Sequence, residues 1–260
     1  MVAVVTRTVP SVNAGILALG AALPVTRTAF YNKLNTTEPA VAAALVRHVA
    51  TKARALLEAM GGLRPAPLPG WTMRVLDGNH LPASDKRLAA LRGFRGAARP
   101  GHTLVLYDPD SALVCDIVAC EDAHQSERVA AATLIESALA QQVWIADRHF
   151  CTAALLRGLS ERQACFIVRE HAHHPRVSER GPWGQCTDIE TGRVREQGIK
   201  LKSHECQEQP WRRIEIELSS PTESGDTHIA LWSNLPSDIE AAGEGVDQAR
   251  ARPDARAAPR

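Results

Sequence analysis

The chain has 260 residues, of which 45% are apolar and 23% charged, and its formal net charge is +1. This length and apolar content suit one or two globular domains, and they exclude a disordered, collagen-like or disulfide-dense small protein. No apolar run approaches the roughly 20 residues that span a bilayer, so a membrane-embedded protein is also excluded. The near-neutral total hides a bias, because residues 1–70 hold seven Lys or Arg against two Glu.

The cellular compartment is indicated by the N-terminal stretch and the cysteines. The apolar segment 14–25 follows Arg7 and could be read as the core of a secretory signal, but Pro24 blurs the cleavage pattern. The six cysteines are dispersed and form no C-x-x-C motif, which is typical of reduced thiols and speaks against a zinc knuckle. We therefore expect a cytoplasmic protein.

Residues 11–60 are predicted to be helical. Thr36 or Thr37 can cap a helix with Pro39 in its first turn. Apolar residues then recur near helical spacing, at Val41, Leu45, Val49, Ala53, Leu56 and Met60. A Gly- and Pro-rich linker, 61–70, ends this region.

The segment 24–35 resembles the second half of a helix-turn-helix. Thr26, Arg27, Tyr31 and Lys33 would then be available to contact phosphates or base edges. A small helical cap with a solvated basic face explains the same residues equally well. DNA binding by residues 1–70 is thus one of two open interpretations.

From Trp71 the pattern changes to strands. Three strands are predicted over 71–77, 102–107 and 112–120, joined as a meander. A helix from Asp122 to Gln141 follows, with Gln125 placed for a capping box and Val129, Leu134, Ala138 and Leu139 on its apolar side. A strand over 142–146, a helix over 152–162 and a strand over 164–169 complete a β-β-β-α-β-α-β order. This order predicts an α/β fold, a mixed sheet with flanking helices.

The last third of the chain differs again. Polar and apolar residues alternate within 171–235, notably over 193–202, 212–218 and 228–232, which predicts a β-rich insertion. Trp183, Trp211 and Trp232 are expected in its core rather than as stacking platforms for bases. Residues 237–260 contain almost no large apolar side chains and are expected to be disordered.

Two aspartates follow apolar strands directly. Asp77 ends the first predicted strand and Asp147 ends the fourth. Functional groups collect at the carboxyl ends of strands in open α/β sheets, so both carboxylates converge if these strands are neighbours. Two close carboxylates repel unless a cation lies between them, and oxygen ligands suit Mg²⁺ or Mn²⁺. The simpler alternative, that each Asp only caps the next turn, is disfavoured by the pairing.

These segments resemble a known family. The stretches 75–81, 100–106, 121–127, 145–152, 166–169 and 231–236 are similar to the RNase H-like catalytic domain of DDE transposases, specifically the insertion-sequence-four group. The resemblance covers about residues 70–236. It implies a small helical N-terminal region, 1–70, a catalytic core, 71–170, and the family's β insertion with its following strand, 171–236.

The resemblance also implies a chemistry. Asp77 and Asp147 would be the first two members of a triad that binds Mg²⁺ or Mn²⁺. The enzyme would cut transposon ends and join them to target DNA, acting with the terminal repeats and through self-association on DNA, and would be nucleoid-associated. The family's third acid lies in Y-x2-R-x3-E-x6-K, whereas neither Glu240 nor Glu244 has an Arg four residues before it. We therefore expect a frameshifted or truncated copy with weak or no catalysis.

Basic residues accompany the two acids. Lys86, Arg87, Arg92, Arg95 and Arg99 lie between the first two strands, with no acid from 86 to 107. They suit a phosphate backbone passing the metal site, although an ordinary solvated face is the alternative. Arg148 and His149 could contact the scissile phosphate or only begin the next helix. The histidines of 171–174 match no standard zinc spacing.

Three functions remain open. The first is a two-aspartate, metal-dependent transposase that is catalytically incomplete. The second is a non-catalytic DNA-binding remnant that occupies transposon ends. The third is an RNase H-like nuclease that works with two protein acids.

Overall fold

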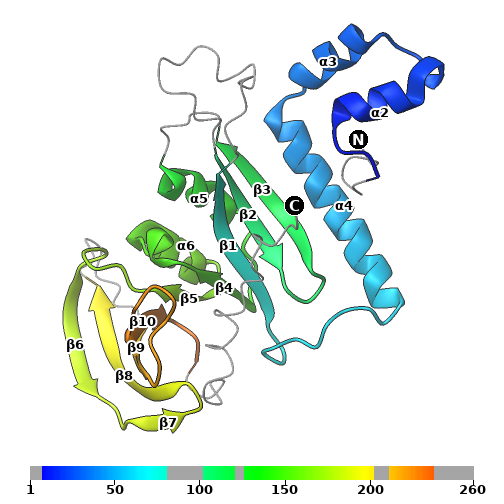
Figure 1. The fold of residues 1–260 in the computed structure, drawn as a ribbon. Coiled ribbons are helices and arrows are strands. Elements are labelled where there is room, and N and C mark those ends of the chain that lie inside the picture. The colour runs from blue at the N-terminus through cyan, green and yellow to red at the C-terminus, as the bar shows by residue number, and fades with distance from the viewer. Residues whose placement is uncertain (1–7, 81–101, 121–125, 202–210, 237–260) are drawn as a thin grey trace.

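A mixed sheet organises the chain in the computed structural model, which describes residues 8–80, 102–120, 126–201 and 211–236 (Figure 1). The strand order is β3-β2-β1-β4-β5-β10-β9-β8-β6, and β7 pairs with β8. The strands are β1 (Thr72–His80), β2 (His102–Asp108), β3 (Leu113–Cys120), β4 (Gln142–Ala146), β5 (Cys165–Arg169), β6 (Val177–Trp183), β7 (Thr187–Ile189), β8 (Gly192–Leu201), β9 (Trp211–Leu218) and β10 (His228–Ser233). The predicted meander is confirmed, because β1, β2 and β3 are antiparallel neighbours. β4 then pairs with β1, and β5 with β4, both in parallel.

Two apolar clusters cover the two faces of the central strands. One contains Leu76, Trp144 and Phe166 together with buried residues of α5 (Glu127–Ile135) and α6 (Ala153–Glu161). The other contains Met73, Val143 and Ile145 and draws its buried members from β9 and β10. Successive residues of a strand point to opposite faces, so the odd-numbered residues of β1 and β4 share one face and the even-numbered residues share the other.

Helix α5 is shorter than predicted. It begins at Glu127 after the N-cap Ser126, whose side chain accepts from the Arg128 amide. The predicted first turn, with Asp122 and Gln125, lies outside the described residues. Leu134 and Ala138 are buried as predicted, whereas Val129 and Leu139 are exposed, so that part of the predicted apolar side is wrong. The helix ends at Ile135 because the chain must turn to enter β4, and Gln141 adopts a positive φ of 61° there.

The N-terminal region is helical, as predicted. It contains α2 (Val12–Leu19), the short η1 (Gly20–Ala22), α3 (Arg27–Asn35) and α4 (Pro39–Ala59). The cap of α4 is Glu38, not Thr36 or Thr37. Both threonine hydroxyls instead donate to carbonyls of the last turn of α3, so they are engaged by the preceding helix.

Helix α4 packs on β3 through a face that the periodicity does not predict. The large apolar residues Val41, Leu45, Val49, Leu56 and Met60 are exposed. The buried positions are Ala43 and Ala50, whose small side chains allow close approach. Between them Arg47 Nη1 donates to Asp116 Oδ1 at 2.9 Å, and Arg54 pairs with Asp108. The helix itself was predicted correctly. The spacing of its large apolar residues does not indicate the face that contacts β3, because small residues and ion pairs make this contact.

The β-rich region beyond residue 171 is confirmed as strands and continues the central sheet. β10 pairs antiparallel with β5 and with β9, which joins β6 to β10 into one sheet with the core. Trp211 and Trp232 are buried, as predicted, whereas Trp183 is 38% exposed beneath the guanidinium of Arg195. The expected disorder of 237–260 concerns residues outside the described part of the chain.

Two further expectations concern the described residues. None of their helices is both long and apolar enough to cross a bilayer. Cys115, Cys120, Cys151, Cys165 and Cys186 are free thiols. Burial raises the pKa of Cys151 and of Cys165 to about 11, so both thiols stay protonated near neutral pH.

Candidate active site

The two predicted aspartates lie on neighbouring strands. Asp147 follows the last residue of β4, as predicted, whereas β1 continues beyond Asp77 to His80, so the prediction that Asp77 ends its strand is wrong. In the parallel pairing of β1 with β4, Leu76 is the partner of Ala146. Asp77 follows Leu76, and Asp147 follows Ala146. Val75 and Ile145 precede them on the same face and pack together in the second apolar cluster. The register therefore directs both carboxylates to the same side of the sheet, at one rim.

Each aspartate also has a local structural role. Asp77 Oδ1 accepts from the Gly78 amide at 3.0 Å. Asp147 is the N-cap of a short 3-10 helix, η3 (Arg148–Phe150), and its Oδ1 accepts from the His149 amide at 2.8 Å. Capping thus explains part of the role of Asp147, but it does not explain why a second carboxylate lies beside it on the adjacent strand.

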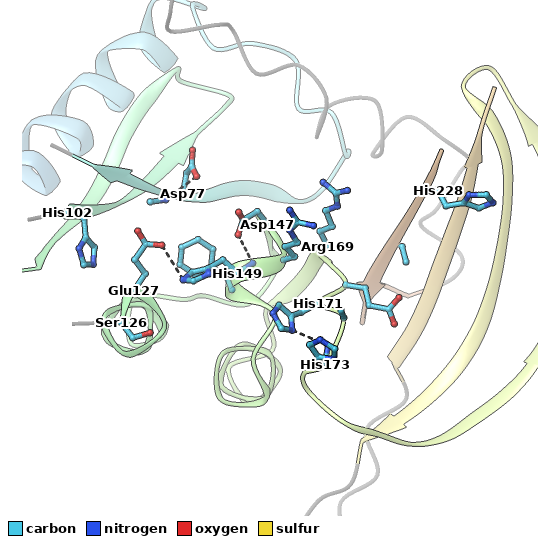
Figure 2. Close-up of a pocket in the computed structure, with 16 residues that line it drawn as sticks. Asp77, His102, Ser126, Glu127, Asp147, His149, Arg169, His171, His173 and His228 are labelled. Carbon is cyan, nitrogen blue, oxygen red and sulfur yellow. Dashed lines mark hydrogen bonds and ion pairs between the residues drawn. The ribbon is translucent and has the colours of Figure 1, made fainter. Parts of the chain in front are cut away.

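A pocket of about 1010 Å³ opens at this rim (Figure 2). Its acidic lining residues are Asp77, Glu127, Asp147 and Glu170, and its basic ones are Arg148, Arg169 and the histidines His102, His149, His171, His173 and His228. Acidic and basic groups thus share one concave surface. Such a surface suits a ligand with negative charge that is bridged to carboxylates by a cation.

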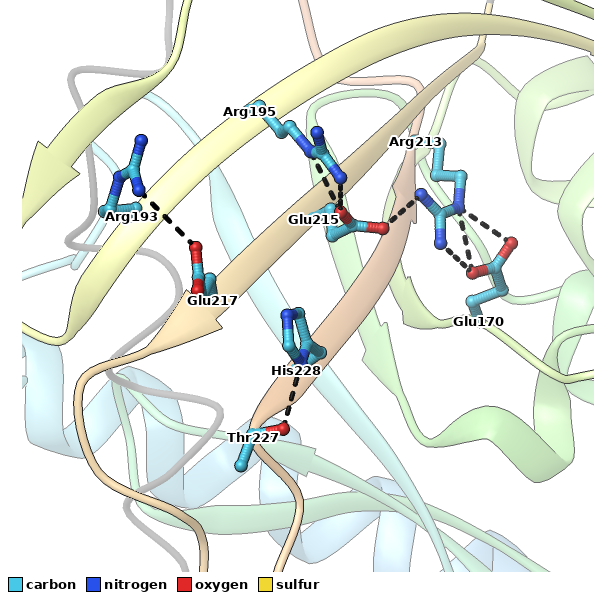
Figure 3. Close-up of polar contacts among 8 residues, drawn as sticks. All are labelled: Glu170, Arg193, Arg195, Arg213, Glu215, Glu217, Thr227 and His228. Carbon is cyan, nitrogen blue, oxygen red and sulfur yellow. Dashed lines mark hydrogen bonds and ion pairs between the residues drawn. The ribbon is translucent and has the colours of Figure 1, made fainter.

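The end of β5 supplies a further wall of the pocket. Arg169 Nη2 donates to Asp226 Oδ2 at 2.7 Å, and that hydrogen bond lowers the pKa of Asp226. Glu170 is held by Arg213, whose Nε lies 2.9 Å from Oε2, and by the Trp232 indole N–H at 3.2 Å from Oε1 (Figure 3). Glu170 therefore serves as a structural anchor between β5 and β9.

The anchoring network extends away from the pocket. Arg213 Nη1 donates to Glu215 Oε2 at 2.8 Å, and Arg195 also binds Glu215 (Figure 3). Burial opposes ionisation of Glu215, but the hydrogen bonds from Arg195 and Arg213 prevail and lower its pKa. This ladder fixes β8 and β9 relative to β5.

Two of the histidines that line the pocket, His171 and His173, lie close together in sequence. The His171 ring stacks on that of His174, with centroids 5.8 Å apart, and the His173 amide donates to His171 Nδ1. Burial, followed by the positive charge of Arg128 and the neighbouring histidines, lowers the pKa of His171. His171 is therefore neutral near pH 7 and gains its charge only in mildly acidic solution.

The two aspartates fit a hard divalent cation. Mg²⁺ is bound through one or two carboxylates, keeps several waters and shares substrate phosphates, so it does not require a cage of protein ligands. Within 8–80, 102–120, 126–201 and 211–236, no three His, Cys, Asp or Glu side chains are grouped closely enough to hold one ion.

The predicted DNA-binding residues are distributed unevenly. Arg148 lines the pocket beside Asp147. Arg27 and Lys33 lie on α3, with the Arg27 guanidinium 5.9 Å from the Tyr31 ring centroid, and they do not line the pocket. The predicted basic loop, with Lys86, Arg87, Arg92, Arg95 and Arg99, lies outside the described residues.

Three of the Asp, Glu and Arg residues that line the pocket, namely Glu127, Arg169 and Glu170, were not predicted as site residues. Glu127 reaches the pocket because α5 begins there, and Arg169 and Glu170 do so because β5 runs parallel to β4. The strand-end argument that selected Asp147 applies equally to Arg169 and Glu170. Glu127 could have been found only from the position of α5 in three dimensions.

Comparison with known proteins supplies the family. The sequence model of one family, described as "Transposase DDE domain", matches residues 73–229, more than half of the chain. The chain belongs to the DDE transposase family. Both aspartates and Glu127 fall within the matched region, and the mixed α/β sheet agrees with an RNase H-like transposase domain. Membership implies a role in DNA transposition and binding to DNA. No curated protein matches the chain significantly.

Proposed function

We propose that this DDE transposase belongs to the insertion-sequence-four group and acts on transposon ends by divalent-metal-dependent phosphoryl transfer, with Asp77 and Asp147 as the metal-binding carboxylates. The parallel register of β1 and β4, which directs both residues to one rim, carries this proposal. The family match covers both positions.

In this proposal the acidic pocket residues bind the metal and the arginines bind phosphates. Asp77 and Asp147 would hold Mg²⁺ or Mn²⁺, which when bound lowers the pKa of a water nucleophile and stabilises the leaving oxygen. Arg148 and Arg169 would bind phosphates on either side of the scissile bond, since guanidinium groups match phosphate geometry. His149, whose amide is fixed by Asp147, would orient the carboxylate.

The N-terminal region would supply further affinity for DNA. Residues 1–70 carry the excess of basic side chains, and Arg27 and Lys33 on α3 would contact phosphates of the transposon ends. The basic residues 86–99 would add contacts to DNA. We propose that Arg92→Ala, Arg95→Ala and Arg99→Ala, combined, weaken binding and flatten its salt dependence, since each lost phosphate contact removes about 0.9 from the slope. Unchanged binding across a salt titration would remove the loop from the contact surface.

One observation favours a second candidate, a DNA-binding remnant without catalysis. No segment with the Y-x2-R-x3-E-x6-K pattern follows Pro236 in this sequence. Without a third acid, positioning of the metal and the reacting groups suffers, and small positional errors are costly in phosphoryl transfer. We therefore propose that these 260 residues cut DNA weakly or not at all. Sequencing the locus tests this proposal. If a frameshift has removed the motif, another reading frame beyond the codon for Pro236 encodes it.

Nicking of supercoiled DNA in Mn²⁺ separates these candidates. Metal-dependent nicking that disappears in Asp77→Asn and in Asp147→Asn supports an enzyme. DNA binding without nicking supports the remnant. Nicking that persists in both variants would contradict the assigned site. Asp188→Asn is the matched control, because that side chain is 91% exposed on β7 and does not line the pocket.

A further inference from the structure

The first turn of α5 lies against the strand that carries Asp77. Glu127 is the first residue of this helix, and its side chain is only 16% exposed. Its carboxylate occupies the space where a side chain on Gly78 would lie. A Cβ added at Gly78 would be 2.6 Å from Glu127 Oε1 and 2.9 Å from Cδ, closer than real contacts allow. The absence of a side chain at Gly78 therefore leaves the space that the Glu127 carboxylate occupies at the rim of the pocket.

The same helix turn holds the residues that follow Asp147. Glu127 Oε2 lies 3.6 Å from His149 Nε2, and Arg128 Nε donates to the His149 carbonyl at 2.9 Å. The His149 amide in turn donates to Asp147 Oδ1. Phe150, the last residue of this turn, is 1% exposed and packs in the first apolar cluster. Figure 2 shows Glu127 and His149 joined by a dashed line.

Glu127 is placed to support the metal site rather than to join it. Leu76 and Gly78 face α5, whereas Val75 and Asp77 face the opposite side, because side chains alternate along a strand. The Glu127 carboxylate thus lies on the other face of β1 from the Asp77 carboxylate. It reaches Asp147 only through His149 and its turn.

We propose that Glu127 is a positioning residue for the metal site, and that it fixes the His149 turn so that Asp147 stays aligned with Asp77. This inference rests on the proposed function, in which the two aspartates bind the metal. Residues behind metal ligands typically contribute about 10- to 100-fold to metal affinity. Gly78 belongs to the same device, since it provides the space that Glu127 fills.

A simpler role for Glu127 is available, and it makes a different prediction. An acidic residue in the first turn of a helix stabilises that helix through its dipole. Asp at position 127 keeps this charge but is one methylene shorter and does not reach His149. Glu127→Asp therefore retains the dipole interaction and loses the proposed positioning contact.

The test is calorimetric titration of the full chain with Mn²⁺. We expect Glu127→Ala and Glu127→Asp each to weaken binding about 10-fold or more. Gly78→Ala should also weaken it, because the added methyl displaces the carboxylate. In Gly78→Ala/Glu127→Ala the methyl has room, so the double variant should match Glu127→Ala alone, a non-additive result expected of residues in contact. Glu136→Ala, exposed at the other end of α5, is the control and should bind as the wild type does.

A second readout does not need the metal. Hydrogen exchange of the His149 amide reports its bond to Asp147, and we expect exchange about 10-fold faster in Glu127→Asp, at unchanged circular dichroism. Wild-type affinity and unchanged exchange in Glu127→Asp would overturn the positioning role. Failure of the wild type itself to bind Mn²⁺ would instead overturn the proposed function.

Discussion

Leu76 of β1 and Ala146 of β4 are partners in a parallel pair of strands, and an aspartate follows each of them. This pairing places Asp77 and Asp147, which are distant in sequence, beside each other at one rim of the sheet. Strand register is fixed by packing, since a shift by one residue would exchange Val143 and Ile145 with Trp144 and Ala146 between two apolar clusters of different shape. The geometry of the aspartate pair is therefore a consequence of the core.

The ion pair between Glu170 and Arg213 is expected to matter for stability. The Arg213 side chain is 12% exposed and contacts both Glu170 and Glu215. Arg213→Ala would leave Glu170 without its main ionic partner and would remove one of the two guanidinium groups that bind Glu215, at a cost of about 3 kcal/mol in the free energy of unfolding. Urea denaturation measures this change.

Arg193 provides the matched control for that experiment. It lies on β8 and pairs with Glu217, but its side chain is 60% exposed. Arg193→Ala should cost less than about 1 kcal/mol, because exposed ion pairs contribute little. Equal costs for both variants would show that the Glu170 ladder contributes no more than a surface pair.

Phe150 is expected to be a main core contact of the turn after Asp147. It is 1% exposed and lies in the cluster formed with α5 and α6. Phe150→Ala should lower the free energy of unfolding by about 3–5 kcal/mol. Val129→Ala on α5, where the native side chain is 59% exposed, should change it by less than about 0.5 kcal/mol. A large loss in the free energy of unfolding of Val129→Ala would show that Val129 faces the core, as the apolar spacing predicts.

His171 is expected to make DNA binding depend on pH. Its lowered pKa keeps it neutral near pH 7, and protonation below its ordinary value of about 6.5 adds one positive charge to the pocket edge. DNA affinity should therefore rise as the pH falls from 7.5 to 5.5, with a steeper salt dependence. Fluorescence anisotropy at both pH values measures this effect.

His171→Gln isolates this contribution. The variant should bind as the wild type does at pH 7.5 and show a smaller gain at pH 5.5. An identical pH response in both proteins would place His171 away from the bound phosphates.

Local patterns were sufficient to predict most of the elements. The boundaries of β4, α6 and β5 follow from apolar runs and caps, and the meander follows from its turn chemistry. Asp147 was predictable because the end of β4 is a local feature, whereas Asp77 lies within β1, which continues to His80. The parallel order of the two strands follows from the connection between them. The same reasoning extends to Arg169 at the end of β5.

The remaining features depend on three-dimensional packing. The inward face of α4 could not be predicted because it consists of Ala43, Ala50 and ion pairs from Arg47 and Arg54, whereas periodicity favours the larger apolar residues. Glu127 reaches the pocket because α5 packs against the sheet and because Gly78 leaves it room. Neither condition has a signature in the sequence of α5 alone.

The most direct test of the two-aspartate site is Mn²⁺ titration of the wild type, Asp77→Asn and Asp147→Asn, each confirmed as folded by circular dichroism. The shared rim predicts that the wild type binds Mn²⁺ and that each variant loses more affinity than the about 10-fold expected for a supporting residue. Wild-type affinity in either variant would show that the two carboxylates do not share a cation.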